Sequence, residues 1–577
     1  MVTVQFAYNN RKMSADAGVT VAEALVANGV RVGNYSVRLR RWREEHHPFK
    51  EVPSAWVTVD GVPNVNAYRV RILSGMEVAS QTRMDVLTSI ASRWPAGFYY
   101  RMFKRPEIVR KLFYREIEKH NDYGGAVEPL KAVNNSIAEL EFSDSSTQDV
   151  DALIIGAGRA GIAASLEIDA DRLSVFLMDR GDLNDIEKAY AHVVSESAEM
   201  QNIIKSATSP AKTLASTLAS RGITLMANTT VFGHYDGLFA AISGESRVML
   251  LKPRFVILCT GSDEIKPGFR NNDIPGVMTA ASFLSMPEKC RVLYAREQTT
   301  LFLESRISRH ETAEIASSAR VRNLVIGYEC DDAERKRIAE AFSVDAERMF
   351  AGTVAAAHGR SSIRQVTIRT VTGEKVRLAT GLLILAGRKQ PRIEIPYLMD
   401  MPLRFDSKLH MPLPAVDGTF RSGNAYACGS LAGMTGMASV ASGLICGAVL
   451  SERLGRRTAG GEELRLWHSI VDSMEEGKQY LSAVEDGRCV LCPCLDVSAG
   501  DIATAIAEGY DTVNMIKRYT GLFMGPCQGA RCLRNSLEYF TACSGREPDI
   551  PTVRPPVTPV CVGALARTSL QQAVDRE

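Results

Sequence analysis

Apolar and polar residues alternate in the first stretch of the chain, VTVQFAYNNRKMSADAG, with the two-residue period of a β-strand. The pair Asn9-Asn10 stands where two such strands would turn into a hairpin, and a helix is predicted to begin near Thr20. A second alternating stretch, AWVTVDGVPNVNAYRV, predicts further strands with a turn at Asp60-Gly61. The pattern therefore predicts a small sheet with one helix at this end of the chain.

A long stretch without charged residues runs from Ser422 to Ser451 and ends in GMTGMASVASGLICGAVLS. It is rich in Gly and Ser rather than in Leu and Ile, so its transfer into lipid would be weakly favourable at best. We therefore predict a buried helix that packs tightly against a sheet or a cofactor, and no membrane span.

An apolar strand in the middle of the chain leads into a glycine-rich turn. The stretch DVDALIIGAGRAGIAASLEI contains the strand residues 152–155, followed by Gly156, Gly158 and Gly161 at the spacing G-x-G-x-x-G. The first glycine permits the turn, the second lets a pyrophosphate approach the backbone, and the third lets the following helix pack on the strand. This pattern predicts a Rossmann domain that binds an adenine dinucleotide.

Later strands predict further residues beside the same nucleotide. The strand LSVFLMDR ends where a carboxylate can bind a ribose hydroxyl. The stretches RFVILCTGS and TFRSGNAYACGS resemble two landmarks of glutathione-reductase-type flavoprotein domains. The second landmark usually ends in Gly-Asp, and the missing carboxylate leaves FAD, NAD and another adenine nucleotide open. These stretches contribute the candidate residues Asp179, Arg180, Thr260, Gly261, Gly429 and Ser430.

The composition excludes several classes of protein. The 577 residues are 45% hydrophobic and 23% charged, which is typical of a globular protein. A net charge of +2 argues against binding to nucleic acid. The N-terminus MVTVQFAYNN lacks the pattern of a secretory leader, so we expect a cytoplasmic protein. In that reducing compartment, clustered cysteines indicate metal or redox chemistry rather than disulfides.

Four of the twelve cysteines form two close pairs late in the chain. Cys492 and Cys494 form a C-x-C pair, and Cys527 and Cys532 follow as C-x4-C after 32 intervening residues. Two pairs of thiolates can hold a [2Fe-2S] cluster, and tetrahedral zinc accepts the same four ligands. Cys489 would replace Cys492 if the register of the first pair is shifted.

The stretch between the two cysteine pairs predicts two short helices, one from Ser498 to Gly509 and one from Asp511 to Gly521. After the second pair, a turn leads into another helix, whose free N–H groups can bond to the sulfurs of an anionic cluster. The whole arrangement resembles the small helical [2Fe-2S] domain of bacterioferritin-associated ferredoxin, which favours iron over zinc.

Nearly the full length of the chain resembles one family, the α subunit of heterotetrameric sarcosine oxidase and of multisubunit opine, proline and hydroxyproline dehydrogenases. The matching stretches are PAGFYYRMF, the glycine-rich turn, NNDIPGVM, LLILAGRKQP and RPPVTPVCVGALA. The resemblance implies a β-grasp fold, like that of plant-type ferredoxins, at the N-terminus. The chain has no cysteine before Cys259, and Tyr68 stands where a last ligand is expected, so we expect this domain to lack a cluster.

The resemblance and the patterns together predict a multidomain α/β protein. A glutathione-reductase-type Rossmann domain is interrupted by a second Rossmann-like insert, in which we find no glycine-rich phosphate loop. The expected domains are a β-grasp domain over 1–95, a helical linker over 96–148, the dinucleotide-binding domain over 149–290 and 376–460, the insert over 291–375, the helical [2Fe-2S] domain over 461–545, and a tail over 546–577.

The resemblance implies an electron-transferring subunit of a hetero-oligomer that acts on the C–N bond of a secondary amine or imino acid. In the family, a β subunit folded like D-amino-acid oxidase binds FAD and oxidises the substrate, and FMN is held between the subunits. A further small subunit is compatible with this assembly. The sequence shows no amino-acid clamp beside a flavin, so no catalytic residue is assigned.

Two other functions stay open from the sequence. One is a self-contained NAD(P)H-dependent iron–sulfur flavoprotein reductase, which requires a working second nucleotide site in residues 291–375. The other is a nucleotide-binding structural subunit with a zinc-filled or vestigial cysteine site.

Overall fold

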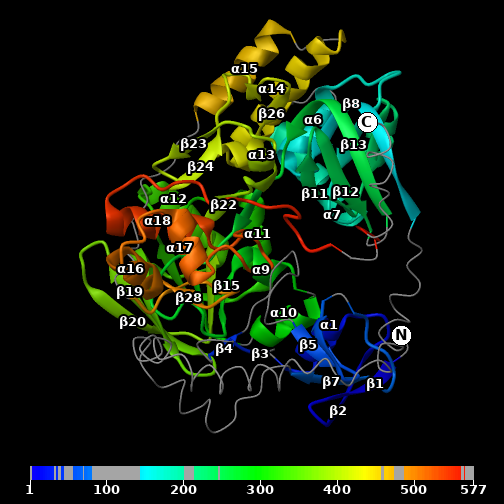
Figure 1. Cartoon of the computed structure of the whole chain (residues 1–577). Coiled ribbons are helices and arrows are strands. Elements are labelled where there is room, and N and C mark those ends of the chain that lie inside the picture. The colour runs from blue at the N-terminus through cyan, green and yellow to red at the C-terminus, as the bar shows by residue number, and fades with distance from the viewer. Residues whose placement is uncertain are drawn as a thin grey trace.

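The computed structural model arranges the chain as three sheet-containing bodies and a small helical domain (Figure 1). The expected linker over 96–148 lies outside the described residues, except for its last six positions, and so does PAGFYYRMF. Within the described part, no helix is long and apolar enough to cross a membrane. The structure describes residues 3–30, 34–36, 41–43, 56–68, 70–80, 143–199, 213–244, 247–286, 288–295, 297–456, 460–473, 487–560 and 564–565.

The N-terminal body is the predicted β-grasp sheet, with strand order β2-β1-β7-β5-β6. The hairpin turns at Asn9 and Asn10, which adopt φ values of 49° and 65°, as a tight primed turn requires. Helix α1 begins after Thr20, whose side chain forms a capping box with Glu23. The elements are β1 Thr3–Tyr8, β2 Arg11–Asp16, α1 Val21–Ala27, β3 Asn34–Tyr35, β4 Trp42–Arg43, β5 Trp56–Val59, β6 Val62–Asn66 and β7 Glu77–Ser80.

The Rossmann body is built on a sheet of order β10-β9-β8-β13-β12-β11, to which β26 and β25 are added. Strand β8 begins at Ser143, so the strand extends into the region expected to be a helical linker. The elements are β8 Ser143–Ile155, α6 Arg159–Glu167, β9 Val175–Met178, α7 Leu183–Glu199, α8 Leu214–Ala219, β10 Ile223–Met226, β11 Thr229–Tyr235, β12 Leu238–Ser243, β13 Arg247–Leu258, β25 Arg421–Ser422, β26 Ala425–Ala427 and α14 Gly436–Arg453.

The uncharged stretch forms the buried helix α14, as predicted, and its partner is helix α6. A Cβ atom at Gly443 would clash with the carbonyl oxygen of Ala160, and one at Gly447 with that of Ala164. The two helices can therefore approach this closely only because both positions are glycine. Helix α15, Gly461–Asp472, packs on α14 and buries Trp467, so this helix belongs to the Rossmann body and not to the expected cluster domain over 461–545.

The expected second Rossmann-like insert forms a further α/β body, called the second body below, with a sheet of order β15-β21-β16-β17-β18-β19-β20. Strands β15 and β21 of this sheet lie outside the expected insert over 291–375 in the sequence. Both belong to the sheet all the same, because β15 pairs in parallel with β21, and β21 pairs in parallel with β16. The expected boundaries are therefore too narrow on both sides. The elements are β15 Val277–Thr279, α9 Ala280–Leu284, α10 Glu288–Ala295, β16 Thr299–Leu303, α11 Arg309–Ser318, β17 Val321–Ile326, α12 Asp332–Phe342, η4 Ala346–Arg348, β18 Met349–Gly359, β19 Ile363–Thr370, β20 Lys375–Ala379 and β21 Leu382–Ala386.

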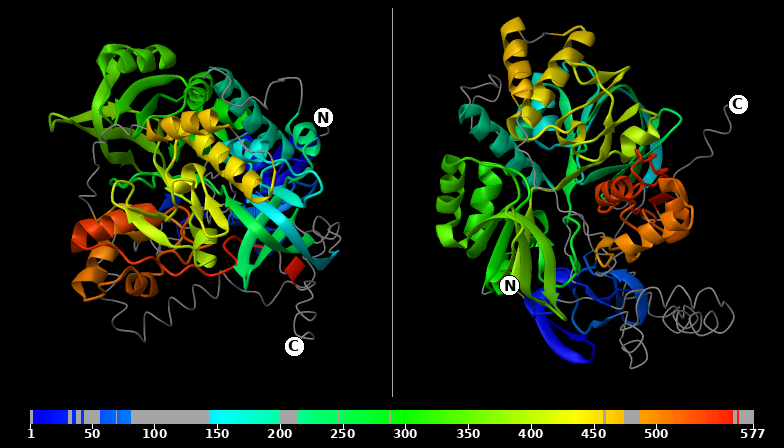
Figure 2. Two further views of the ribbon diagram at one scale, coloured as in Figure 1. Left: turned by 90° about the horizontal axis from the view of Figure 1, so that it is seen from above. Right: turned by 90° about the vertical axis from the view of Figure 1, so that its left-hand side faces the viewer.

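The helical domain contacts strand β24, Met411–Pro414, through helix α18, and its hydrophobic core is continuous with one face of the Rossmann sheet. Along β8, Ala152 and Ile154 face α6 and α14, whereas Leu153 and Ile155 share a second hydrophobic core with the helical domain. In the right-hand view of Figure 2, the orange helices of this domain and the green second body lie on opposite sides of the molecule. The elements of the helical domain are β27 Val490–Cys492, β28 Val497–Ser498, α16 Ala499–Ala507, α17 Val513–Thr520 and α18 Leu533–Ser544.

The two predicted helices between the cysteine pairs are present. Ser498 and Asp501 form the capping box of α16, and Gly521 ends α17 in the left-handed conformation. The N-cap of α17 is Thr512 rather than Asp511. The remaining short elements connect the bodies and are β14 Ser262–Glu264, β22 Lys389–Pro391, α13 Glu394–Leu398, β23 Leu403–Asp406, β24 Met411–Pro414 and η5 Gly429–Ala432.

Candidate nucleotide and cluster sites

Three parallel strands of the Rossmann sheet end at the same edge. Ile155 of β8 pairs with Leu258 of β13, and Leu258 pairs with Ala427 of β26. The glycine-rich turn and the two later landmarks follow these strand ends, so the structure brings all three together. The contact is close, because a Cβ atom at Gly261 would lie 3.9 Å from Oγ of Ser430. Ligands of open α/β sheets bind at this carboxyl edge.

The three glycines of the turn have the different roles that the sequence predicts. Gly156 has φ of +104°, and a Cβ atom there would clash with the carbonyl oxygen of Cys259. A Cβ atom at Gly161 would clash with the carbonyl oxygen of Gly156, so this glycine permits helix–strand packing. A Cβ atom at Gly158 would meet no atom within 4 Å, so the backbone here faces open space. This open cradle fits the pyrophosphate of a dinucleotide.

Asp179 has a structural contact that sequence reasoning missed. Its Oδ2 accepts a hydrogen bond of 2.7 Å from the backbone N–H of Ala157, and its Oδ1 accepts one of 2.6 Å from Gly181. Asp179 therefore holds the glycine-rich turn in place. Each carboxylate oxygen has a further lone pair, so the same side chain can also accept from a ribose hydroxyl.

Arg180 and Thr260 lie close to the buried ion pair of Asp263 and Arg392. Burial, and then the charge of Arg392, lowers the pKa of Arg180 to about 9. The buried Asp263 pairs with Arg392 at 2.7 Å and stands 3.9 Å from Arg180. The hydroxyl of Thr260 donates to the carbonyl oxygen of Arg392 at 3.0 Å. Both candidate residues are therefore held next to Arg392 and Asp263.

Gly429, in the second landmark, closely approaches helix α6, which follows the glycine-rich turn. Its N–H donates to Oγ of Ser442 at 3.0 Å, and a Cβ atom at Gly429 would lie 2.7 Å from the Cβ of Ala160. The glycine is therefore needed for the close approach of the two segments. The Ser430 side chain that follows it is half-buried. Serine can donate or accept a hydrogen bond here, but it lacks the charge of the usual carboxylate.

The four predicted cysteine ligands form a closed ring of sulfurs. The thiol of Cys494 donates to the sulfur of Cys527 over 3.4 Å. Hydrogen bonds from Cys494 and Cys532 lower the pKa of Cys492, and bonds from the same two thiols lower the pKa of Cys527. Two pairs of thiols distant in sequence thus occupy one site, which is the donor set that a [2Fe-2S] cluster or zinc takes.

On one side of the ring, the sulfurs of Cys494 and Cys527 lie 3.4 Å apart. Among the described residues, no group of three or more His, Cys, Asp or Glu side chains is already arranged to hold a metal ion. Binding of a metal at the ring requires the thiols to lose their protons. Outside the ring, Cys543 and Cys489 lie near Tyr539, whose pKa is raised by burial and then by these two cysteines.

Two residues that the sequence reasoning did not single out shape the ring. Nη2 of Arg531 lies 3.5 Å from Sγ of Cys494, where its charge can offset that of thiolates. A Cβ atom at Gly525 would clash with the Cβ of Cys494, so this position has room only for glycine. Both lie in the stretch GPCQGARC, and the cationic residue between the two cysteines was the available signal for Arg531.

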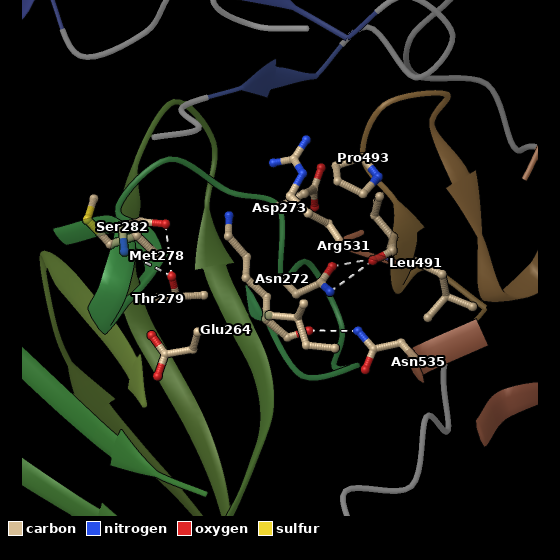
Figure 3. A pocket seen from close by; sticks show the side chains of 13 residues that line it. Glu264, Asn272, Asp273, Met278, Thr279, Ser282, Leu491, Pro493, Arg531 and Asn535 are labelled. Carbon is tan, nitrogen blue, oxygen red and sulfur yellow. Dashed lines mark hydrogen bonds between the residues drawn. The ribbon is translucent and has the colours of Figure 1, made fainter. Parts of the chain in front are cut away.

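A cavity of about 50 Å³ lies between residues next to the cysteine ring, such as Leu491 and Arg531, and the residues from Glu264 at the end of β14 (Figure 3). Arg531 reaches into it from the cluster side, and Glu264 lines its other side. Asn272 spans the boundary, because its amide nitrogen donates to the carbonyl oxygen of Val490 at 2.9 Å and its oxygen accepts from the Val490 N–H at 3.1 Å. Asn272 therefore joins the segment before β15 to strand β27 beside the cysteine ring.

Glu264 should make the stability of the protein depend on pH. Burial raises the pKa of Glu264 to about 7, although N–H groups of Ala281 and Gly387 donate to its carboxylate. Between the unfolded pKa and this value the folded chain binds more protons than the unfolded chain, so stability falls as pH rises through that window. We expect the melting temperature of Glu264→Gln to exceed that of the natural chain increasingly from pH 5 to pH 8. A constant difference across this range would contradict the assignment.

A buried ion network fixes the helical domain to the second body. The guanidinium of Arg388 contacts Glu304 at 2.5 Å, Asn535 at 2.8 Å, and Glu538. Burial lowers the pKa of Arg388, but the charges and hydrogen bonds of Glu304 and Glu538 together outweigh burial, so the net effect is a raised pKa. Arg43 forms a second such link, because it pairs with Asp273 and, at 2.6 Å, with Asp496 beside the cysteine ring.

Removal of the Arg388 charge should destabilise the protein strongly. Arg388→Met leaves two buried carboxylates without their partner, which we expect to lower the free energy of unfolding by about 3–5 kcal/mol. Urea denaturation followed by circular dichroism measures this loss. Arg546→Met is the matched control, because its ion pair with Asp511 is about half exposed and should contribute about 1 kcal/mol or less. Equal losses in both variants would show that the network is not the main link.

The fold and the two sites define a class: an α/β chain that joins a glutathione-reductase-type Rossmann body and a ferredoxin-like N-terminal domain to a helical domain with four gathered thiols. Two family models match parts of the chain, one described as a 2Fe-2S iron-sulfur cluster binding domain over residues 2–83, and one as the sarcosine oxidase A3 domain over residues 487–569.

Individual proteins match over greater lengths. The α subunit of sarcosine oxidase from Rhizobium meliloti is 25% identical over 98% of this chain and 58% of its own length. An opine oxidase subunit of Agrobacterium tumefaciens is 21% identical over 75% of this chain and 94% of its own. The crystal structure of L-proline dehydrogenase from P. horikoshii superposes with a TM-score of 0.62 at 19% identity, covering 98% of this chain and 97% of that one, and this likeness shows the fold.

The chain is thus similar to sarcosine oxidase α subunits along nearly its whole length, in agreement with the resemblance, and the predicted fold class is confirmed. It spans somewhat more than half the length of these relatives. The first cysteine of the chain is Cys259, so the N-terminal domain that matches the cluster-binding family has no thiol to hold a cluster.

Proposed function

We propose that the chain is the electron-transferring α subunit of a multisubunit flavin-dependent oxidoreductase that acts on the C–N bond of a secondary amine or imino acid. The observation that carries this proposal is the gathering of four cysteines, distant in sequence, in a helical domain whose hydrophobic core is continuous with Leu153 and Ile155 of the nucleotide-binding strand β8. The relatives, which are subunits of sarcosine oxidase and of opine oxidase, supply the substrate class.

In this proposal, the chain positions its cofactors and tunes them. Gly156, Gly158 and Gly161 cradle the pyrophosphate of FAD or another adenine dinucleotide, and Asp179 orients the turn and the ribose. Cys492, Cys494, Cys527 and Cys532 hold a [2Fe-2S] cluster, which supplies one-electron transfer when bound. The N–H of Gly529 bonds to Cys527 and that of Leu495 to Cys492, so the backbone also stabilises thiolate charge.

We further propose that substrate oxidation takes place in a partner, a flavoprotein β subunit folded like D-amino-acid oxidase, with FMN held at the interface between the subunits. A further small subunit would complete a cytoplasmic hetero-oligomer.

A self-contained NAD(P)H reductase is disfavoured by the loop after β16. In a second nucleotide site, this loop would carry glycines whose N–H groups face a phosphate. The loop instead begins with Glu304, whose side chain is 9% exposed and is bound to Arg388. A buried acid at this position is unfavourable for a phosphate, so the second sheet supports a structural role.

The test combines the chain with the flavoprotein encoded beside it. Under anaerobic conditions, sarcosine, proline and an opine are added in turn, and the cluster is followed by electron paramagnetic resonance. We expect no amine oxidation by the chain alone and reduction of its cluster when the partner is present. Turnover by the chain alone, or a cluster that stays oxidised while the partner flavin is reduced, would overturn the proposal. Zinc without iron in the purified chain would favour the structural alternative.

A further inference from the structure

The cysteine ring comes nearest to solvent at Cys527, the ring member that is half-buried while the other three are buried. The residues on either side of it, Pro526 and Gln528, both line an open hollow of about 510 Å³. The hollow lies between helix α17 and the tail segment around Arg554, which the hydrogen bond from Lys517 to the carbonyl oxygen of Thr552 holds beside the helix. An outside molecule in this hollow would therefore stand next to a proposed cluster ligand.

The hollow is positively charged. Lys517, Arg518 and Arg554 line it, and the pKa of Lys517 is lowered by burial and then by the charges of Arg554 and Arg518. Within the described ranges, none of these three side chains forms an ion pair with a carboxylate. Three cations thus gather on one surface without compensation, which is unfavourable in the isolated chain and favourable for an acidic partner.

Apolar side chains accompany these charges. Met524 lines the hollow and is 57% exposed, and Met515 and Tyr519 of α17 are also exposed. Exposed methionine and aromatic residues beside arginine are typical of protein–protein contacts. The surface is concave, which suits a protruding protein better than a flat lipid surface.

We propose that this basic hollow, formed by Lys517, Arg518, Met524, Pro526, Gln528 and Arg554, is the docking surface for an acidic one-electron carrier protein. The inference rests on the proposed function, because it assigns the exit of electrons from the Cys492–Cys532 site. In the transfer, one electron leaves the reduced cluster and enters the oxidised carrier, so the cluster is oxidised, the carrier is reduced, and no bond or proton is exchanged. Interfaces of this kind are small and transient, and their rates depend on charge.

The test measures reoxidation of the reduced cluster by two high-potential acceptor proteins of opposite charge, acidic plastocyanin and basic cytochrome c, in a stopped-flow instrument. For the natural chain we expect the rate with plastocyanin to fall as salt is added. In Lys517→Glu/Arg518→Glu, the low-salt rate with plastocyanin should fall on the order of tenfold, and the rate with cytochrome c should not fall. The matched control is Lys375→Glu/Arg377→Glu, which makes the same charge change on the exposed strand β20 and should leave both rates within about twofold.

Several outcomes would overturn the docking proposal. The first is a reoxidation rate that falls equally with both acceptors, or equally in the control variant. The second is a charge-reversal variant that no longer assembles with the flavoprotein partner. The third is binding of the natural chain to anionic phosphatidylserine vesicles that the double variant loses. Calorimetric titration with metal-free plastocyanin tests the surface without a cluster. Binding that depends on Lys517 and Arg518 in a chain that holds no iron would leave the docking surface standing and refute the proposed electron-transfer function, whereas an intact cluster without such binding would do the reverse.

Discussion

Replacement of Cys492 or Cys527 by serine is expected to abolish the visible iron–sulfur absorption of the purified chain. These two cysteines occupy opposite corners of the ring, and the neighbouring thiols of Cys494 and Cys532 lower the pKa of both. A hydroxyl is a poor replacement for a thiolate at iron, and the loss of one corner leaves an iron with one protein sulfur. The measurement is the absorption spectrum, with iron and acid-labile sulfide determined on the same sample.

Cys543→Ser is the matched control for this prediction. Cys543 is exposed in helix α18 and influences Tyr539 rather than the ring, so the spectrum of this variant should equal that of the natural chain. Cys489→Ser separates the two possible registers of the first pair, and it should also retain the bands. Equal bleaching in all of these variants would contradict the assigned ligand set.

Replacement of Gly158 by valine is expected to abolish retention of the adenine nucleotide while the fold persists. Gly158 has an extended backbone, with φ of −77°, and a Cβ atom there meets no protein atom within 4 Å. The added side chain therefore fills only the space that the pyrophosphate needs. The measurement is nucleotide released on denaturation and identified by chromatography, together with the melting temperature from circular dichroism.

Two other substitutions define what this result means. Gly161→Val should lower the melting temperature, because its side chain would clash with the backbone of Gly156. Asp179→Ala removes an acceptor from the turn as well as from the ribose, so we expect weaker retention by roughly 1.5–3 kcal/mol for each charged hydrogen bond lost. If the denatured natural chain releases no nucleotide of any kind, the site assignment fails.

Local signals in the sequence determined the elements that surround both sites. The capping box at Ser498, the paired left-handed residues Asn9 and Asn10, and the glycine-rich turn each depend on hydrogen bonds or backbone angles within a few residues. The spacing of the cysteines likewise predicted which thiols meet, because two short capped helices leave little freedom in how the pairs return to each other. These features could be read without any knowledge of the fold.

The tertiary structure alone decided which elements share a sheet or a core. Strands β15 and β21 join the second sheet through parallel pairing, and helix α15 packs on α14, and neither contact has a periodic signature in the sequence. The tertiary structure alone also decided the buried ion network at Arg388, the position of Arg531 beside Cys494, and the basic hollow between α17 and the tail. The sequence by itself therefore determined which residues are candidates for the two sites. The common hydrophobic core and the access of solvent depend on contacts between separate segments, which only the tertiary structure decided.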